Sequence, residues 1–239
     1  MLSVEEIISD IPQNAAYRQT IIQKYPSRPG AHWDDARWDI FYDEHDKEIR
    51  NICTSQVADN KIADELPLNK TPYMYDVIYK YNADGTIDER TAVYSETVRV
   101  SRFIYFGKKK AIREIRSETG SSDTVISYEY DDHDNPIKAH YSIDGEALHT
   151  DEYKYEYDEK GRIVYKVFIN RLFSELIVKT WYEYDDRGNL TTKKEMNEGA
   201  DFPSYEKYYY DENDRLIRQE SYMNEKLLSE SFYTYEFFR

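Results

Sequence analysis

One short motif recurs along most of this 239-residue chain: two aromatic residues separated by one position and followed by a polar turn. Aligned on the second aromatic residue, successive copies lie 24 to 27 residues apart. A fixed period of this length indicates a tandem array of one small structural unit. A degenerate further copy begins at Tyr42. The aligned positions are Tyr81, Phe106, Tyr130, Tyr157, Tyr184, Tyr210 and Tyr235.

Each unit has the sequence of a β-hairpin. In Tyr155-Glu156-Tyr157 the two rings share one face of a strand, because side chains alternate along a strand. Asp158 then begins a turn, and Gly161 stands where the chain needs positive φ. Where this glycine is missing, Asp46, Asp134 or Asp214 takes its place, and aspartate tolerates positive φ better than most residues. Ile163 opens the return strand.

A second turn closes each unit, as in Ile143-Asp144-Gly145, so one unit contributes two strands. The sequence therefore predicts a mainly β protein: an antiparallel meander of roughly fourteen strands in an extended, twisted or curled sheet. Residues 1–38 are expected to form a helical N-terminal segment. Its signs are a capping box at 3–6 and an amphipathic pattern over 15–25. Residues 39–239 form the repeat array, regular from about 75, with an irregular loop near 53–72.

Composition restricts the partners and the compartment. The net charge of −15 argues against nucleic acids and anionic membranes as partners and favours a basic one, although it also serves solubility. Cys53 is the single cysteine, so the chain forms no internal disulfide. The acidic N-terminus lacks the features of a signal peptide, and no 18-residue apolar run occurs. These observations predict a cytoplasmic protein.

No catalytic or cofactor motif stands out. The segment Asp131-Asp132-His133-Asp134-Asn135 combines carboxylates with an imidazole, but it lacks the spacing of a calcium-binding loop and repeats the pattern at 43–46. None of the five histidines lies in a known catalytic pattern, and phosphate-binding glycine motifs are missing from the sequence. We therefore expect neither an enzyme nor a metal or cofactor site.

Two of the units resemble a known family. The segments Tyr157-Asp158-Glu159-Lys160-Gly161-Arg162-Ile163 and Tyr184-Asp185-Asp186-Arg187-Gly188-Asn189-Leu190 are similar to the YD repeat of Rhs and teneurin-type proteins. The resemblance covers roughly residues 75–239. In that family the repeats build shells that enclose cargo, often a toxin. The resemblance implies a short stand-alone bacterial member, too short to close such a shell and without a toxin module.

Two surfaces are candidates for binding a partner. The Tyr-Asp turns should share one sheet edge and gather their carboxylates into an acidic ridge, although turn geometry alone also explains these residues. Trp181, Tyr205, Tyr209 and Phe232 lie on the strand face opposite the tyrosine pairs, where they either pack or meet a ligand. The candidate partner-binding residues are Asp131, Asp132, Asp134, Asp158, Asp185, Asp186, Asp211, Asp214, Trp181 and Tyr209.

Two functions follow as hypotheses. The first is an immunity protein that neutralises a cognate bacterial toxin by occlusion, with a basic toxin domain as its partner. It rests on the acidic charge, the lack of catalytic motifs and the resemblance to toxin-delivery proteins. The alternative is a structural or carbohydrate-binding YD-repeat module of the cell envelope, which would use its aromatic face.

Overall fold

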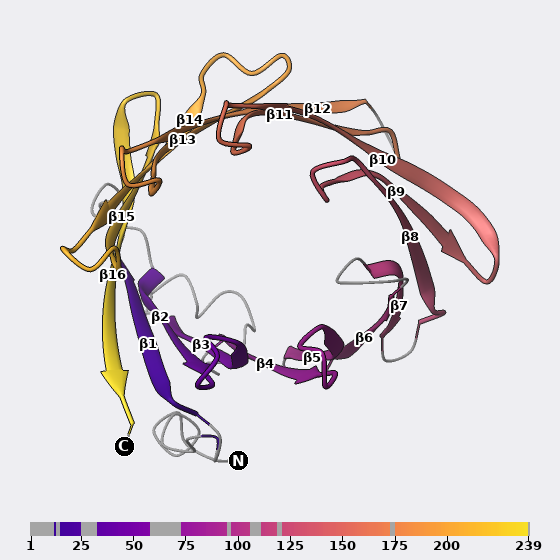
Figure 1. Ribbon diagram of the computed structural model, residues 1–239, viewed down its shortest axis with the longest axis horizontal. Coiled ribbons are helices and arrows are strands. Elements are labelled where there is room, and N and C mark those ends of the chain that lie inside the picture. The colour runs from indigo at the N-terminus through magenta and orange to yellow at the C-terminus, as the bar shows by residue number, and fades with distance from the viewer. Residues whose placement is uncertain are drawn as a thin grey trace, which may run out of the picture.

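The computed structural model is a closed antiparallel β-barrel (Figure 1). It describes residues 12, 15–24, 33–57, 73–94, 97–105, 111–118, 121–172 and 175–238. Each strand pairs with its neighbours in sequence, and the last strand pairs with the first to close the ring. The strands are β1 (Tyr17–Lys24), β2 (Trp33–Tyr42), β3 (Glu48–Val57), β4 (Tyr73–Tyr81), β5 (Ile87–Tyr94), β6 (Thr97–Tyr105), β7 (Ala111–Glu118), β8 (Thr124–Tyr130), β9 (Pro136–Ile143), β10 (Glu146–Tyr157), β11 (Ile163–Asn170), β12 (Leu176–Tyr184), β13 (Leu190–Asn197), β14 (Ser204–Tyr210), β15 (Leu216–Met223) and β16 (Lys226–Phe237).

The predicted fold class is wrong in two respects: the sheet is closed rather than open, and strand β1 replaces the helix expected over residues 15–25. Strand β1 pairs in full register with β16 on one side and with β2 on the other. These two ladders satisfy its backbone groups, and tertiary pairing of this kind routinely overrides local helix propensity. The capping-box helix predicted at the extreme N-terminus lies outside the described residues.

The Tyr-Asp turns have the geometry that the sequence predicts. In one of them Gly161 donates its N–H to the Asp158 carbonyl oxygen (2.9 Å), and Asp158 donates its N–H to the Arg162 carbonyl oxygen (2.9 Å). Gly161 has a φ of 77°, and Asp134 and Asp214 have φ values of 69° and 60° at the equivalent position. The predicted requirement for positive φ is therefore confirmed at these turns.

Tyrosine hydroxyls tie each unit to the one before it. Tyr184 donates its hydroxyl to the Ile163 carbonyl oxygen (2.9 Å), at the start of the preceding unit's return strand. The same bond joins Tyr210 to Leu190 (2.9 Å). Each bond satisfies a carbonyl group beside the turn, where a β-bulge breaks the regular ladder. The repeated tyrosine thus links neighbouring hairpins through a hydrogen bond.

The two faces of the barrel wall differ in burial over most strands, although Asp39, Phe41 and Ile52 on β2 and β3 are buried on the face opposite the tyrosine pairs. On the face that carries the tyrosine pairs, Ala92, Ala139 and Thr180 are 0%, 1% and 3% exposed. On the opposite face, Ile78 and Ile104 are both 42% exposed. Side chains converge on the concave side of a closed barrel and diverge on its convex side. The tyrosine-pair face is therefore the inner wall, and the opposite face is the outer wall.

Candidate functional site

The inner wall is an aromatic surface interrupted by polar side chains. The register places Lys166 directly between Tyr155 on β10 and Thr180 on β12. Tyr153 and Phe168 stand opposite each other beside them, with ring centroids 5.2 Å apart. Burial raises the pKa of the Tyr153 hydroxyl, so this group stays protonated as a hydrogen-bond donor at neutral pH. Porins of sixteen to eighteen strands leave an aqueous channel inside the barrel, and the inner wall of this closed barrel faces the corresponding space.

Most inner-wall charges are paired within the wall. Arg116 contacts the Glu114 carboxylate at 3.1 Å, and Tyr128 donates its hydroxyl to the other Glu114 oxygen at 2.9 Å. Glu114 is 5% exposed, so this pairing compensates for a buried charge. Burial together with the neighbouring Glu114 carboxylate raises the pKa of Tyr128. Arg99 binds Glu118 in the same way on the adjoining strands.

A second polar group lies on the inner wall between β9 and β11. The rings of Tyr141 and His149 stack with centroids 4.2 Å apart. Asn170 donates its side-chain N–H to Asp151 at 2.6 Å, and Asp151 also lies 3.6 Å from His149 Nε2. The Nδ1 atom of His149 is buried and has no hydrogen-bond partner in the described part of the chain. This combination of rings and hydrogen-bonding groups suits a polar ligand that also presents an apolar face.

The outer wall carries rows of ion pairs. Arg50 binds Asp76 at 2.8 Å across β3 and β4. Glu89 on β5 binds Lys80 at 2.7 Å and Arg102 at 3.2 Å on the strands to either side. Such cross-strand pairs of opposite charge stabilise a sheet surface that is in contact with water.

The acidic ridge predicted from the sequence is largely committed to the turns. The carboxylate of Asp158 accepts the backbone N–H groups of Lys160 and Arg162, both at 2.9 Å, and also binds the Arg162 guanidinium. The backbone bond from Arg162 holds the pKa of Asp158 below its usual range. Asp131, Asp185 and Asp211 accept a backbone N–H in the same way. These carboxylates build the hairpins.

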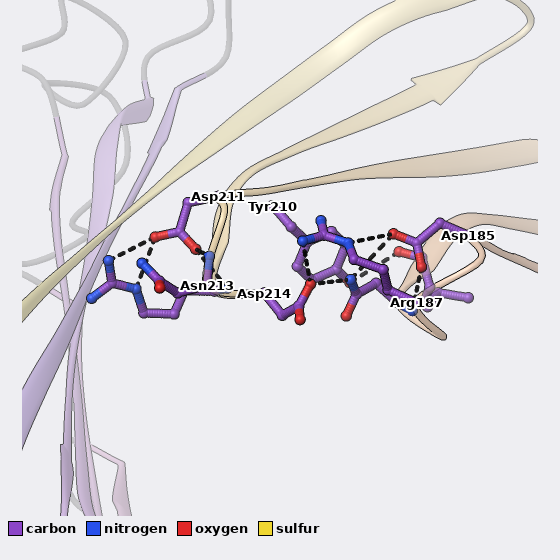
Figure 2. Close-up of polar contacts among 9 residues, drawn as sticks. Asp185, Arg187, Tyr210, Asp211, Asn213 and Asp214 are labelled. Atoms are coloured by element: carbon purple, nitrogen blue, oxygen red, sulfur yellow. Dashed lines mark hydrogen bonds and ion pairs between the residues drawn. The ribbon is translucent and has the colours of Figure 1, made fainter.

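The remaining ridge residues fall into two groups. Asp134 and Asp214 occupy the positive-φ position, and Asp214 is also bridged to Asp185 by Arg187, 2.8 and 3.8 Å away respectively (Figure 2). Asp132 and Asp186 follow the turn aspartates and are exposed. A partner-binding role for this ridge stays a prediction, with Asp132 and Asp186 its most accessible members.

Substituting Asp211 and its neighbour Glu212 separates turn formation from surface charge. We expect Asp211→Ala to lower Tm by about 2–4 °C at pH 7, because it deprives the Asn213 and Arg215 amides of their acceptor. Glu212→Ala removes the same charge without a turn bond and should leave Tm within about 1 °C. The Arg215 amide lowers the pKa of Asp211, so the carboxylate contributes stability above its unfolded pKa, and this contribution is lost as pH falls through the lower folded pKa. The gap in Tm between Asp211→Ala and the wild type should therefore begin to shrink at about pH 4 in thermal melts, and it should close further as pH falls through the lowered folded pKa. A pH-independent gap would contradict this role.

The aromatic candidates lie on the outer wall. Lys194 lies over the Trp181 ring at 5.3 Å, and Arg218 lies over the Tyr209 ring at 4.4 Å. Tyr209 also donates its hydroxyl to the buried carboxylate of Glu220 at 2.5 Å. These contacts are internal to the sheet, and a role of Trp181 and Tyr209 in partner binding stays a prediction.

The inner wall is a candidate site that was not predicted residue by residue from the sequence. The signal was present, because the tyrosine pairs share one face with Lys166, Glu114 and Asp151 at alternate positions. It could not be used without knowing that this face closes around a lumen. Among the described residues, no group of three or more histidine, cysteine or acidic side chains could hold a metal ion. The described residues also include no helix long and apolar enough to cross a membrane.

Comparison with known proteins identifies the fold. No protein-family model matches the sequence, and no curated protein matches it. A porin-like protein from Bacteroides uniformis is similar in structure, with a TM-score of 0.62 and 8% identity, over 95% of this chain and 98% of that one. A porin-like protein from Bacteroides vulgatus is similar with a TM-score of 0.55 and 14% identity, over 91% of this chain and 97% of that one.

This likeness corrects the expected setting of the protein. The chain has the closed-barrel fold of porin-like proteins over nearly its whole length. The prediction of a cytoplasmic immunity protein built as a YD-repeat sheet is therefore wrong in its compartment and in its architecture. The acidic N-terminus and the lack of a long apolar run had indicated the cytoplasm. A barrel of short strands needs no such run, so that pattern carried no information about this fold.

Proposed function

We propose that the protein is a non-catalytic binding barrel of the cell envelope that takes an oligosaccharide into its lumen. The observation that carries the proposal is the inner wall, which combines tyrosine rings with hydrogen-bonding side chains whose charges are mostly paired. A sugar ring presents C–H bonds on its face and hydroxyls at its edge. Aromatic faces and polar side chains complement these two parts of the sugar.

The charged side chains on the outer wall favour a barrel that is surrounded by water. Arg50, Asp76, Lys80 and Glu89 all carry charges on this wall as ion pairs, and the Lys80 side chain is 65% exposed. A lysine or arginine on the lipid side of a membrane barrel costs about 2–4 kcal/mol at the bilayer midplane. Lys194 and Arg218 above outer-wall rings would add to this cost. A second candidate function is passive diffusion of hydrophilic solutes through an outer membrane, which the likeness to porin-like proteins favours.

A binding assay and a conductance assay on the same preparation distinguish the two functions. We expect oligosaccharides of four or more units to bind in calorimetry, and we expect no stepwise conductance when the protein is added to planar bilayers. Tyr153→Leu should weaken binding about tenfold, because it keeps the packing but removes an inner-wall ring. Trp181→Leu is the matched outer-wall control and should bind normally, with both folds checked by circular dichroism. Conductance steps without oligosaccharide binding would overturn the proposal in favour of a porin.

A further inference from the structure

We infer that Lys166 binds a carboxylate on the ligand, and that the oligosaccharide in the lumen therefore contains a uronic acid. This inference rests on the proposed function and names its substrate class. Lys166 projects from the middle of β11 on the inner wall, directly opposite Tyr155 and Thr180. Its Nζ lies 5.4 Å from the centre of the Tyr153 ring.

Lys166 differs from its neighbours in having no carboxylate partner. On the same wall, Arg99 binds Glu118, Arg116 binds Glu114, and Lys193 lies between two glutamates at 3.4 and 3.6 Å. Among the described residues, Lys166 forms no ion pair with a carboxylate, and its ammonium group lies over the Tyr153 ring. Glu195, two strands away beyond Thr180, is already engaged by Lys193.

An unpaired charge on Lys166 is also energetically unfavourable at this position. Lys166 is half-buried, and desolvation lowers the pKa of its ammonium group. The attraction to Glu195 opposes this effect and the repulsion from Lys193 adds to it, so the net direction of the pKa shift is downward. A ligand carboxylate placed against the ammonium group would compensate for the lost hydration with a charge-assisted hydrogen bond. The rings of Tyr153 and Tyr155, both on the neighbouring strand β10, would contact the sugar faces beside the carboxylate.

The overall charge restricts which acidic ligand fits. The chain carries a net charge of −15, and much of it lies in the turns at the barrel rim, so a long polyanion would be repelled. At physiological salt, charges more than about 8 Å apart are largely screened. A short oligosaccharide with few carboxylates can therefore reach Lys166 with little of this repulsion.

The test uses trigalacturonic acid and its methyl ester, which share one sugar backbone and differ in the charge of their carboxyl groups. We expect the wild-type protein to bind the acid about 10-fold more tightly than the ester in calorimetry. Lys166→Gln should remove this preference by weakening the acid and leaving the ester unchanged. Lys194→Gln is the matched control, since its ammonium group lies 5.3 Å from the Trp181 ring on the outer wall, and it should keep the preference.

The outcomes separate the inference from the proposed function. Equal binding of acid and ester by the wild type, or a preference that survives Lys166→Gln, would overturn the role of Lys166 while leaving a neutral-sugar barrel in place. Binding of neutral oligosaccharides with no binding of either galacturonate would do the same. If no oligosaccharide of any charge binds, both the inference and the proposed function fail.

Discussion

The double variant Gln23→Cys/Ser231→Cys is expected to form a disulfide across the seam between β1 and β16. The two residues are direct partners in the register. Phe238 donates its backbone N–H to the Ala16 carbonyl oxygen, so these two residues form a hydrogen-bonded pair. Hydrogen-bonded and non-hydrogen-bonded pairs alternate along an antiparallel ladder, and Ser231 is seven residues before Phe238. Ser231 and Gln23 are therefore a non-hydrogen-bonded pair, in which the side chains lie closer together. The bond closes a loop of about 210 residues and should raise the free energy of unfolding by about 5 kcal/mol in the loop-entropy account.

The matched control moves one cysteine a single strand further along the same wall. Ser221 on β15 pairs with Ser229 on β16, which places it two strand spacings from β1, about 10 Å away. The variant Gln23→Cys/Ser221→Cys should stay reduced, because this separation exceeds the reach of a disulfide. Non-reducing electrophoresis and urea unfolding measure both variants. Failure of the 23/231 pair to oxidise would show that the sheet is open at this seam.

Asp39→Ala is expected to destabilise the protein by about 3 kcal/mol. Asp39 is 1% exposed and accepts hydrogen bonds from Thr20 at 2.8 Å and from the Arg37 guanidinium at 2.7 and 2.9 Å. Removing the carboxylate leaves Arg37 and the nearby Arg18 without the charge that they face between β1 and β2. Breaking a buried pair costs about 3–5 kcal/mol, and the partial exposure of Arg37 places this case at the lower end.

Glu236→Ala provides the control for Asp39. Glu236 also binds Arg18, but its side chain is 56% exposed. An exposed pair contributes about 0–1 kcal/mol, so this variant should unfold almost as the wild type does in urea. Equal losses in the free energy of unfolding for the two substitutions would show that the Asp39 carboxylate does not stabilise the pairing of β1 with β2 more than an exposed carboxylate does.

The hairpin unit could be predicted from the sequence because its determinants are local. Gly161 and Asp134 reveal the positive-φ position, and Asp158 lies within four residues of the amides that it binds. The alternation in Tyr155-Glu156-Tyr157 fixes which side chains share a face. For the same reason, the return strand β11 begins at Ile163, the residue that the sequence indicates.

The N-terminal third was harder to predict because its structure depends on distant partners. Residues 17–24 have a pattern compatible with either helix or strand, and β16, more than 200 residues later, decides between them. The candidate site shows the same limitation. Asp185 looks like a surface charge in the sequence and is a turn acceptor in the structure, whereas Lys166 looks ordinary in the sequence and is an unpaired cation on the inner wall.

The sequence by itself determined the repeating unit: two strands, a turn that needs positive φ, and tyrosines sharing one face. These features arise from steric limits and hydrogen bonds within a few residues. The tertiary structure alone decided that the ends of the sheet meet, and therefore which face is concave. Closure depends on the accumulated twist and stagger of all the strands and on the pairing of β1 with β16. The inner wall, and with it the proposed ligand site, exists only because the ring closes.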